Sequence, residues 1–414
     1  MVPKSTGITN GGEEMRRGSF QQMKAVNKSM ILTKILNDGP ISRAEIAKET
    51  ELTPPTVGTL VKELIKQKLV LESNQGESKG GRKPTMLVIN QSGHLMIGID
   101  AGPRNIEGIL TDLSGKILTH VKSEFSLPIS KEEFFSTLIE TIEAVLEKSS
   151  EYVQDIVGIG VAMHGVVDAD KGESLYAPNL NLRQMPIGER LAEHFPYFIK
   201  VENDVRALTL AENWFGQGKN SERLVVVNIG TGVGSGVTID GELYRGESHI
   251  AGEIGHMTID INGEECTCGN RGCLQTMISG PAIAKRAIKR VNAGEKSSLA
   301  DVKEMTAKNV FLAAETGDQL AQDILHETGS YIGIGLINLI HTLNPSQIVL
   351  TGGVTKAKDY LLPNIKKTVN ERALTERAKQ TTISVSELGD QATALGAVAL
   401  IIRELFSTNS HLEK

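Results

Sequence analysis

All three cysteines of this 414-residue chain lie within eight positions, in the stretch CTCGNRGC that runs from Cys266 to Cys273. An odd number of thiols cannot pair evenly, and in a reducing compartment clustered cysteines are more often metal ligands or redox groups than disulfides. A tetrahedral zinc site takes four ligands. The stretch therefore predicts a zinc-bound loop with Cys266, Cys268 and Cys273 as three of the ligands, and three thiols without a metal are the alternative.

The composition is that of a soluble protein. Charged residues make up 23% and hydrophobic residues 40% of the chain, and neither an apolar run of about 18 residues nor a signal-peptide pattern occurs. These features predict a cytoplasmic location and no membrane partner. The length allows two or three domains with sizeable cores.

Charge is distributed unevenly along the chain. Residues 24–92 hold 11 Lys and Arg against 7 Asp and Glu, so this segment carries +4, whereas the whole chain carries −6 and the remainder therefore −10. A basic module on an acidic body favours a polyanionic partner for the module alone. A solvated charged face is the alternative interpretation.

The basic segment 24–92 has the pattern of a separate helical domain. Residues 1–23 show no periodicity and are predicted to form a flexible arm. From Asn27, NKSMILTKILNDG places apolar residues at helical spacing and ends at Gly39-Pro40, which is a helix stop signal. We therefore expect the first helix to lie between the arm and this proline.

Two further helix starts follow. Ser42 and Glu45 have capping-box spacing, and Thr53 followed by Pro54 is a typical helix N-terminus. Three short helices with a brief turn before the last predict a helix-turn-helix unit. The buried side of the last helix is expected to comprise Val57, Leu60, Val61, Leu64 and Ile65.

The stretch LVLESNQGESKGGRKPTMLVIN has the pattern of a wing, with two β-prone runs joined by a basic, Gly-rich tip. In a winged helix, the third helix enters the major groove and the tip of the wing approaches the minor groove. The alternative is a helix-turn-helix that makes only protein contacts. The predicted DNA-binding residues are Thr53, Thr56, Thr59 and Lys62 on the helix, and Arg82 and Lys83 on the wing.

After residue 92 the pattern changes to alternating strands and helices, which predicts an α/β body. HLMIGIDAG opens one strand–turn–strand unit, and RLVVVNIGTGVGSG opens a second. We predict two lobes with a cleft between them, over residues 93–204 and 205–389, with a C-terminal helix near 390–410 packed on the first lobe.

Residues 27–410 resemble the ROK family of repressors and sugar kinases, in the subgroup with an N-terminal winged helix. The resemblance rests on SKGGRKPTMLVIN, ENDVRA, LYRGESHIAGEIGHMTID and above all CTCGNRGC. Bacterial xylose repressors are the most similar group, followed by glucose and N-acetylglucosamine repressors. The resemblance implies an α/β fold class, in which an N-terminal winged helix-turn-helix precedes a two-lobed actin-like ATPase/sugar-kinase fold.

The resemblance also implies the fourth zinc ligand. The family uses the histidine of EIGH, which is His256 here, and His249 is a rival candidate. A closed set of three cysteines and one histidine is typical of structural rather than catalytic zinc. A zinc-bound imidazole keeps its second nitrogen for a hydrogen bond, so we expect His256 to be held by the metal while it faces a ligand.

The same resemblance implies a sugar site. In the family, Asn203, Asp204, Glu253 and His256 hold the hydroxyls of a pyranose. The kinases have Glu two places after the last cysteine, where this chain has Gln275, which keeps hydrogen-bonding capacity without charge. A carboxylate, an amide and an imidazole suit a polyol, because sugars offer many hydroxyls and little apolar area.

Phosphoryl transfer is predicted to be lost. Asp204 occupies the position of the family's general base and is expected to be vestigial. One phosphate turn keeps Gly230, Thr231 and Gly232, but the other reads DAGPRN, where Pro103 removes an amide donor and Arg104 prevents close backbone approach. We therefore predict that the chain is not an enzyme.

Two residues beside these motifs have open roles. Arg104 either binds an anion or is an ordinary surface arginine. His164, in AMHGVVD, stands where the kinases have proline, and it either contacts the edge of a sugar or is a loop residue.

Together these features predict a sugar-responsive repressor with zinc as cofactor. It would bind a palindromic operator as a homodimer or homotetramer and respond to a monosaccharide effector, with xylose favoured over glucose or an N-acetyl sugar. The first alternative is an ATP-dependent hexose kinase that carries a DNA-binding domain. The second is a repressor controlled by a protein partner rather than by a sugar.

Overall fold

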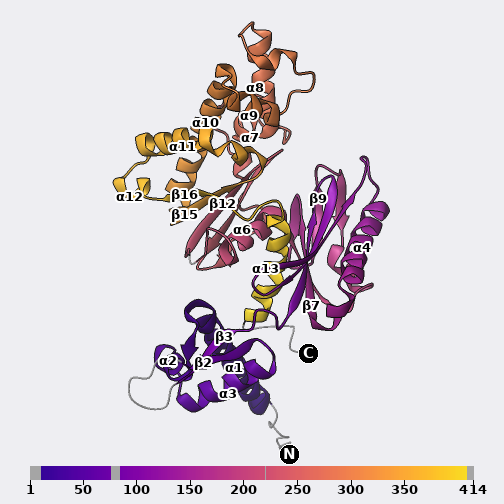
Figure 1. Ribbon diagram of the computed structural model, residues 1–414, viewed down its shortest axis with the longest axis vertical. Helices are drawn as coiled ribbons and strands as arrows, with labels where there is room; N and C mark the ends of the chain where they lie inside the picture. Colours follow the sequence, from indigo (N-terminus) through magenta and orange to yellow (C-terminus); the bar gives the residue numbers. More distant parts are fainter. Residues whose placement is uncertain (1–10, 76–83, 220, 408–414) are drawn as a thin grey trace, which may run out of the picture.

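The computed structural model describes residues 11–75, 84–219 and 221–407. These residues form an N-terminal module of helices and short strands and a body of two α/β lobes (Figure 1). Within the described ranges, no helix is long and apolar enough to cross a membrane. The fold is the mixed α/β architecture predicted from the sequence.

The N-terminal module has the element order expected of a winged helix. The predicted capping box forms, because the Ser42 hydroxyl accepts from the Glu45 amide and the Glu45 carboxylate accepts from the Ser42 amide. Thr53 caps the third helix, and Pro54 lies in its first turn, as expected. The elements are α1 (Gly11–Asp38), β1 (Ile41–Ser42), α2 (Arg43–Glu49), α3 (Pro54–Lys66), β2 (Val70–Gln75) and β3 (Thr85–Ile89), with strand order β1-β3-β2.

The first helix differs from the expectation of an arm over residues 1–23. Helix α1 already begins at Gly11, so residues 11–23 of that segment are helical, and residues 1–10 lie outside the described part. The stretch EEMRR and the following QQMK are good helix formers, and extending an existing helix costs much less than nucleating one. The lack of an amphipathic pattern is therefore no barrier to a longer helix.

Lobe 1 is a five-stranded mixed sheet with order β11-β7-β4-β5-β6. The strands β4, β5 and β6 form an antiparallel meander. Strand β7 pairs in parallel with β4, and β11 pairs in parallel with β7. The sheet comprises β4 (Leu95–Ala101), β5 (Asn105–Asp112), β6 (Ile117–Glu124), β7 (Ile156–Met163) and β11 (Phe198–Asn203), and α4 (Lys131–Lys148) packs on it. A smaller sheet and helix follow β7, namely β8 (Val166–Asp168), β9 (Glu173–Ala177), β10 (Leu182–Met185) and α5 (Ile187–Ala192).

Lobe 2 repeats this topology, as the second strand–turn–strand motif predicted. Its sheet has order β14-β13-β12-β15-β16, with a meander followed by two parallel strands. The strands are β12 (Arg223–Ile229), β13 (Val233–Ile239), β14 (Glu242–Leu243), β15 (Gln347–Thr351) and β16 (Thr382–Val385). The helices are α7 (Gln275–Ile278), α8 (Gly280–Asn292), α9 (Ala307–Glu315), α10 (Gln319–Leu343), α11 (Lys358–Arg372) and α12 (Glu376–Lys379).

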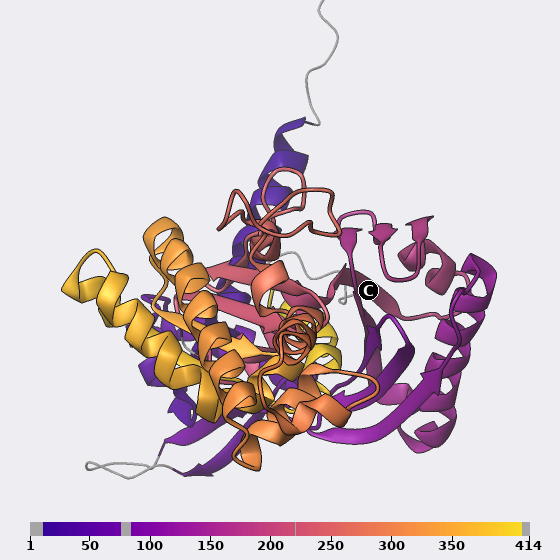
Figure 2. The ribbon, with the colours of Figure 1, turned by 90° about the horizontal axis from the view of Figure 1, so that it is seen from above.

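Two helices lie between the lobes, α6 (Asp204–Trp214) and α13 (Ala392–Phe406) (Figures 1 and 2). Helix α13 packs on α6 and on the sheet of lobe 1, while α6 also packs on β12 and β13 of lobe 2. The contacts are very close. A Cβ at Gly160 of β7 would lie 1.9 Å from the Ala397 carbonyl oxygen, and one at Gly396 would lie 2.1 Å from the Ala207 carbonyl oxygen. These glycines therefore let backbone pack directly on backbone.

The N-terminal module is joined to the body by a shared hydrophobic core. Buried residues of α1, including Ile31 and Ile35, belong to the same cluster as Ile402 and Phe406 of α13. The Ser29 hydroxyl donates to the Phe406 carbonyl at 2.6 Å, and the Phe406 ring meets Trp214 edge to face at a centroid distance of 5.3 Å. The ends of α6 and α13 thus hold the first helix of the module.

The Phe406→Ala substitution should lower the free energy of unfolding by about 3 kcal/mol, because it opens a cavity in this shared core. Urea denaturation of the full chain measures the effect. Leu374→Ala is the matched control, because Leu374 is 82% exposed whereas Phe406 is 8% exposed. Equal stability of the two variants would show that the module is not packed on α13 in this way.

Candidate metal centre and ligand site

The three cysteines and His256 come together as the sequence predicts. Their ligating atoms all lie within 4.8 Å of one another, with His256 Nδ1 3.6 Å from Cys266 Sγ and Cys268 Sγ 3.8 Å from Cys273 Sγ. Cys266 and Cys273 are buried, while Cys268 is exposed. Three thiols and an imidazole at these separations fit a tetrahedral Zn²⁺ ion.

Two thiols of the cluster, those of Cys266 and Cys273, differ widely in pKa. Burial opposes ionisation of Cys266, but hydrogen bonds from Cys268 and His256 outweigh it and lower the pKa of Cys266 to about 6. Burial and the neighbouring Cys266 and Cys268 raise the pKa of Cys273 to about 12. Metal binding needs all three thiolates, and a divalent cation would stabilise their ionised forms.

The backbone of the loop that carries the cysteines is folded by β-bridges and a glycine turn. Antiparallel bridges pair Thr258 with Cys273 and Glu265 with Arg271. At Gly272, φ is +64°, and a Cβ would lie 1.5 Å from the Asp260 carbonyl oxygen. Only glycine fits this turn, which returns Cys273 to the other ligands.

His256 presents its two nitrogens to different surroundings. Nδ1 faces the thiols, while Nε2 lies 3.9 Å from Glu253 Oε2, which is too long for a hydrogen bond. The rival His249 is not in this cluster. Its ligating atoms group instead with those of Asp168 and Asp170, which come from lobe 1. The geometry therefore favours His256 as the fourth ligand.

Gln275 lies against the metal cluster. Its Nε2 donates to Cys266 Sγ and to Thr267 Oγ1, each at 3.2 Å. A Cβ at Gly232 would lie 3.9 Å from Gln275 Oε1, so the amide oxygen points towards that turn. The amide NH₂ group therefore donates to the sulfur of a candidate metal ligand, Cys266, while the amide oxygen can accept from other partners.

Asn203 and Asp204 stand at the junction of β11 and α6. Asn203 caps α6, since its Oδ1 accepts from the Arg206 amide at 3.0 Å, and its Nδ2 donates to the Gly165 carbonyl and to Asp204 Oδ1, both at 2.8 Å. The Val205 amide donates to the same Asp204 oxygen. Both side chains are thus fixed by the strand-to-helix turn.

Two carboxyl groups at this junction hold protons unusually tightly. Burial, with the nearby charge of Glu253, raises the pKa of Asp204 to about 6. Burial and then the charges of Asp204 and Glu107 raise the pKa of Asp100, at the end of β4, to about 7. The pKa of Asp204 is therefore near the range in which a carboxylate works as a general base.

The two candidate phosphate turns differ. Gly230, Thr231 and Gly232 join β12 to β13, and a Cβ at Gly230 would meet nothing within 4 Å, so a ligand can approach the backbone there. In the other turn, Pro103 has no amide hydrogen, and Arg104 is exposed. Only the second-lobe turn has the features of a phosphate cradle.

His164 is a buried residue of lobe 1, 5% exposed. Its Nδ1 lies 3.3 Å from the Ala101 carbonyl oxygen, and burial lowers its pKa, so the ring is neutral at pH 7. Nε2 is buried without a hydrogen-bond partner among the described residues. His164 is therefore a buried residue of the loop between β7 and β8, packed against the end of β4.

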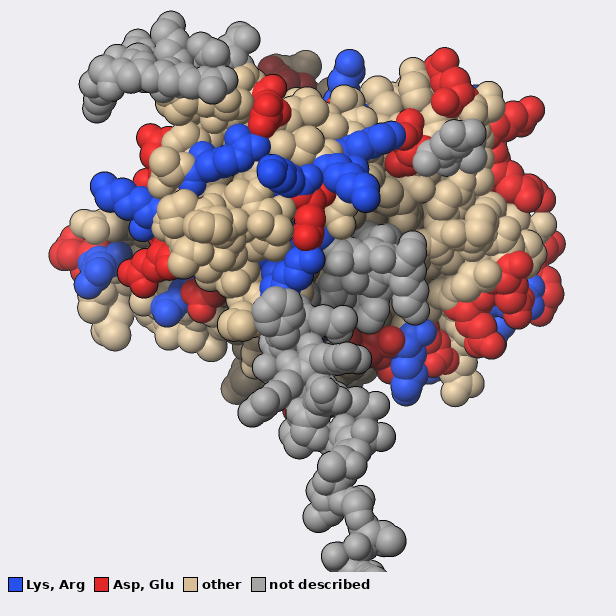
Figure 3. Space-filling model, turned by 90° about the horizontal axis from the view of Figure 1, so that it is seen from below, with Lys and Arg blue, Asp and Glu red and all other residues tan. Residues whose placement is uncertain are grey.

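The third helix of the module has one buried and one exposed side. Val57, Leu60, Val61 and Leu64 are buried as predicted. The candidate DNA contacts Thr53, Thr59 and Lys62 are exposed, and Thr56 is half-buried. Figure 3 shows Lys and Arg side chains spread over the face of the molecule that carries the module. Arg82 and Lys83 lie outside the described residues.

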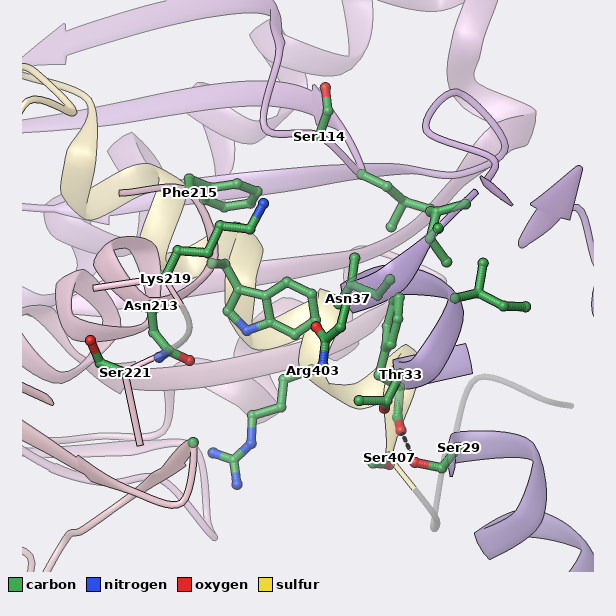
Figure 4. Close-up of a pocket in the computed structure, with 18 of the residues that line it drawn as sticks. Ser29, Thr33, Asn37, Ser114, Asn213, Phe215, Lys219, Ser221, Arg403 and Ser407 are labelled. Carbon is green, nitrogen blue, oxygen red and sulfur yellow. Dashed lines mark hydrogen bonds between the residues drawn. The ribbon is translucent and has the colours of Figure 1, made fainter. Parts of the chain in front are cut away.

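A cavity of about 1110 Å³ lies where the module meets the body (Figure 4). Asn37 and Thr33 of α1 line one side, and Asn213, Lys219 and Arg403 of the body line the other. The cavity does not include the residues predicted to bind sugar. It shows that module and body face each other across open space beside their shared core.

Sequence reasoning missed the charge coupling of Asp100 to Asp204 and a buried ion cluster around Glu202. Glu202 and Asp100 are the first residues of the motifs ENDVRA and DAGPRN, which give no sign of their surroundings. Their environment depends on the pairing of β4, β7 and β11 and on the approach of lobe 2. No local pattern carries that information.

Comparison with known proteins gives consistent relatives along nearly the whole chain. Residues 96–404 match the model of the ROK family. A xylose repressor of Bacillus subtilis is 34% identical over 384 residues, which cover 92% of this chain and 96% of that protein. The DNA-binding transcriptional dual regulator NagC of Escherichia coli is 32% identical over 403 residues, covering 97% and 98%.

Solved structures divide into full-length and body-only matches. A ROK family transcriptional regulator, a homologue of the Escherichia coli MLC protein, matches with a TM-score of 0.84 and 31% identity over 94% of this chain and 98% of its own. A ROK family glucokinase from Streptomyces griseus, in complex with glucose and AMPPNP, matches with a TM-score of 0.66 and 28% identity, covering 74% and 98%.

Metal analysis of two histidine variants tests the ligand set. His256→Ala should lose bound zinc, because it removes the fourth ligand, whereas His249→Ala should keep about one zinc per chain. Elemental analysis after dialysis against a mild chelator measures both. Zinc retained in His256→Ala and lost in His249→Ala would overturn the assignment.

The pH dependence of stability tests the proton at Asp100. Its pKa is about 7 in the folded chain and ordinarily 3.8, so ionising it costs folding free energy as the pH rises from about 4 to 7. Asp100→Asn should therefore raise the free energy of unfolding at pH 8 by about 2 kcal/mol, and the gain should shrink as the pH falls towards 4.

Urea denaturation at several pH values measures this difference. Asp390→Asn is the control, because Asp390 is exposed and should give no pH-dependent gain. A gain for Asp100→Asn that is the same at pH 8 and pH 4 would contradict a raised pKa.

Proposed function

The chain belongs to the ROK family, and we propose that it is a transcriptional repressor that releases a palindromic operator when a monosaccharide binds beside its metal loop. The observation that carries this proposal is the combination, in one chain, of an exposed helix face on a basic module and a His256 imidazole that lies beside three cysteines and 3.9 Å from Glu253. Relatives named xylose repressor cover 94% and 92% of this chain.

DNA would be read by α3 of the module. Thr53, Thr59 and Lys62 lie on its exposed side, and Gly58 has no neighbour within 4 Å of a built Cβ, so a duplex can approach the helix closely. Hydroxyl and ammonium groups on one helix face suit base edges and phosphates in the major groove. Arg82 and Lys83 are proposed to approach the minor groove from the wing.

The sugar would be held by Asn203, Asp204, Glu253 and His256. Zinc, when bound, would offset most of the charge of the thiolates and fix the imidazole of His256 through Nδ1, so that Nε2 faces the hydroxyls. Gln275 Oε1, which points towards the Gly232 turn, is proposed as a further acceptor. D-Xylose is the proposed effector because of the xylose repressors among the relatives, with glucose and N-acetylglucosamine as alternatives.

The effector acts only if it binds two arrangements of the chain with different affinity. Coupling free energies of this kind are typically about 1–3 kcal/mol, or roughly 5- to 150-fold in operator affinity. A homodimer or homotetramer would present two modules to the two half-sites of a palindrome. A change in their separation would then weaken operator binding.

A kinase is the second candidate, supported by Asp204 and the open turn at Gly230. Against it stands Pro103, which removes an amide from the first phosphate turn. A coupled ADP assay over a panel of sugars separates the two functions. ATP-dependent turnover that disappears in Asp204→Asn would favour the kinase.

Operator selection from random duplexes, followed by competition with sugars, tests the repressor directly. We expect enrichment of a palindrome and release of it by D-xylose or another monosaccharide of the panel. In the same assay, Lys62→Ala should weaken binding and reduce the salt slope by about one unit, through the loss of one phosphate contact.

Lys367→Ala, a change at an exposed lysine of α11, is the matched control and should leave the slope unchanged. The proposal fails if no duplex is enriched, or if no sugar of the panel changes the affinity of the enriched duplex.

A further inference from the structure

We infer that Arg245 is a positioning residue for the ligand site: through the buried carboxylate of Glu202, it ties the segment that carries Glu253 and His256 to the strand that carries Asn203 and Asp204. This inference rests on the proposed function for the identity of the ligand. It does not rest on the proposed function for the contacts themselves.

Glu202 is the centre of a buried ion cluster. It is fully buried at the end of β11, one residue before Asn203. Its Oε2 accepts from Arg245 Nε at 2.8 Å and lies 2.7 Å from Arg245 Nη2, so the guanidinium binds through two nitrogens. Its Oε1 accepts from the Asn203 amide at 2.9 Å and lies 3.2 Å from Arg206 Nε.

The cluster needs a carboxylate at position 202. Arg206 is 3% exposed, and its Nη1 is buried without a hydrogen-bond partner among the described residues. Donors therefore already exceed acceptors here, and an amide in place of the Glu202 carboxylate would leave two guanidinium groups without a countercharge. Removal of Arg245 is milder, because Arg206 still faces the carboxylate.

Arg245 belongs to the other lobe. It follows β14 and begins the chain segment that leads to the metal loop. Its carbonyl accepts from the Ala251 amide at 3.1 Å, which closes the turn over residues 245–251. The pair with Glu202 is therefore a contact between lobe 1 and the start of the segment that ends at His256.

The far end of this segment is also fixed. The Gly252 carbonyl accepts from the Ser235 amide at 2.8 Å and from the Ser235 hydroxyl at 3.0 Å, which holds the chain on β13. Glu253 follows directly. The segment thus has two anchors on lobe 2, at Gly252 and at Tyr244, whose amide donates to the Val237 carbonyl at 2.8 Å, and one on lobe 1 at Arg245. Loss of the Arg245 anchor leaves Glu253 positioned by lobe 2 alone.

This arrangement predicts an effect on ligand binding rather than on chemistry. No hydrogen bond or ion pair joins Arg245 to Glu253 or His256, so we expect Arg245 to act through the backbone of the segment. Arg245 places two nitrogens of its planar guanidinium on one oxygen of Glu202, and a lysine ammonium cannot reproduce this two-nitrogen contact. The charge alone is therefore insufficient for full positioning.

The experiment compares Arg245→Gln, Arg245→Lys and the control Arg290→Gln in the full zinc-loaded chain. Arg290 on α8 makes a two-nitrogen pair with Glu295, which follows that helix, away from the ligand residues. Binding of D-xylose, D-glucose and N-acetylglucosamine is measured by calorimetry. Hydrogen exchange of the peptides over residues 245–257 is measured without sugar.

We expect Arg245→Gln to weaken binding of the preferred sugar about tenfold and Arg245→Lys to weaken it less. Exchange over 245–257 should rise in Arg245→Gln while the rest of lobe 2 matches the wild type. Arg290→Gln should leave both readouts unchanged.

The inference is overturned if Arg245→Gln exchanges like the wild type over 245–257, or if its exchange rises equally throughout lobe 2. Sugar affinity within twofold of the wild type would also overturn it. If the wild type binds none of the three sugars, the proposed effector is wrong, and the exchange measurement alone decides the role of Arg245.

Discussion

The close packing of helix α13 is the constraint on which the remaining structure depends. Gly98 and Gly160 let its backbone lie directly on two strands of lobe 1, and Gly396 lets it lie directly on α6. A side chain at any of these positions would separate the layers, because a built Cβ would lie within 2.2 Å of a backbone oxygen. One helix therefore fixes lobe 1 and α6 to each other and, through Phe406, holds the first helix of the module.

The candidate ligand site lies at the N-terminal end of α6, and the contact with Phe406 lies at its C-terminal end. Asn203 caps the N-terminus of α6, while Trp214 at its C-terminus packs on Phe406. A ligand that binds both Asn203 and Glu253 would contact lobe 1 and lobe 2 at the same time. The cavity beside α1 lies between residues of the module and residues of the body. Packed cores respond to displacement by switching between discrete arrangements.

The grouping of the three cysteines and the local helix signals could be predicted from the sequence because they depend on short spacing. Cys-x-Cys, the glycine turn to Cys273, the Ser42–Glu45 capping box and Thr53-Pro54 each specify geometry within a few residues. The repeated strand–turn–strand motif likewise predicted two similar lobes. The proton on Asp100 and the Glu202–Arg245 pair could not be predicted, because both arise where strands and lobes far apart in the chain meet. The early start of α1 was missed because helix extension requires no amphipathic pattern.

The proposed sugar site and the proposed DNA-reading helix are two ends of one coupled assembly. Coupling between binding sites is reciprocal, so each ligand changes the affinity for the other by the same factor. The most direct measurement is the affinity of the zinc-loaded protein for its preferred monosaccharide, with and without saturating operator duplex. We predict that the operator weakens sugar binding by the same factor by which the sugar weakens operator binding. Equal sugar affinity in the presence and absence of operator would contradict the account.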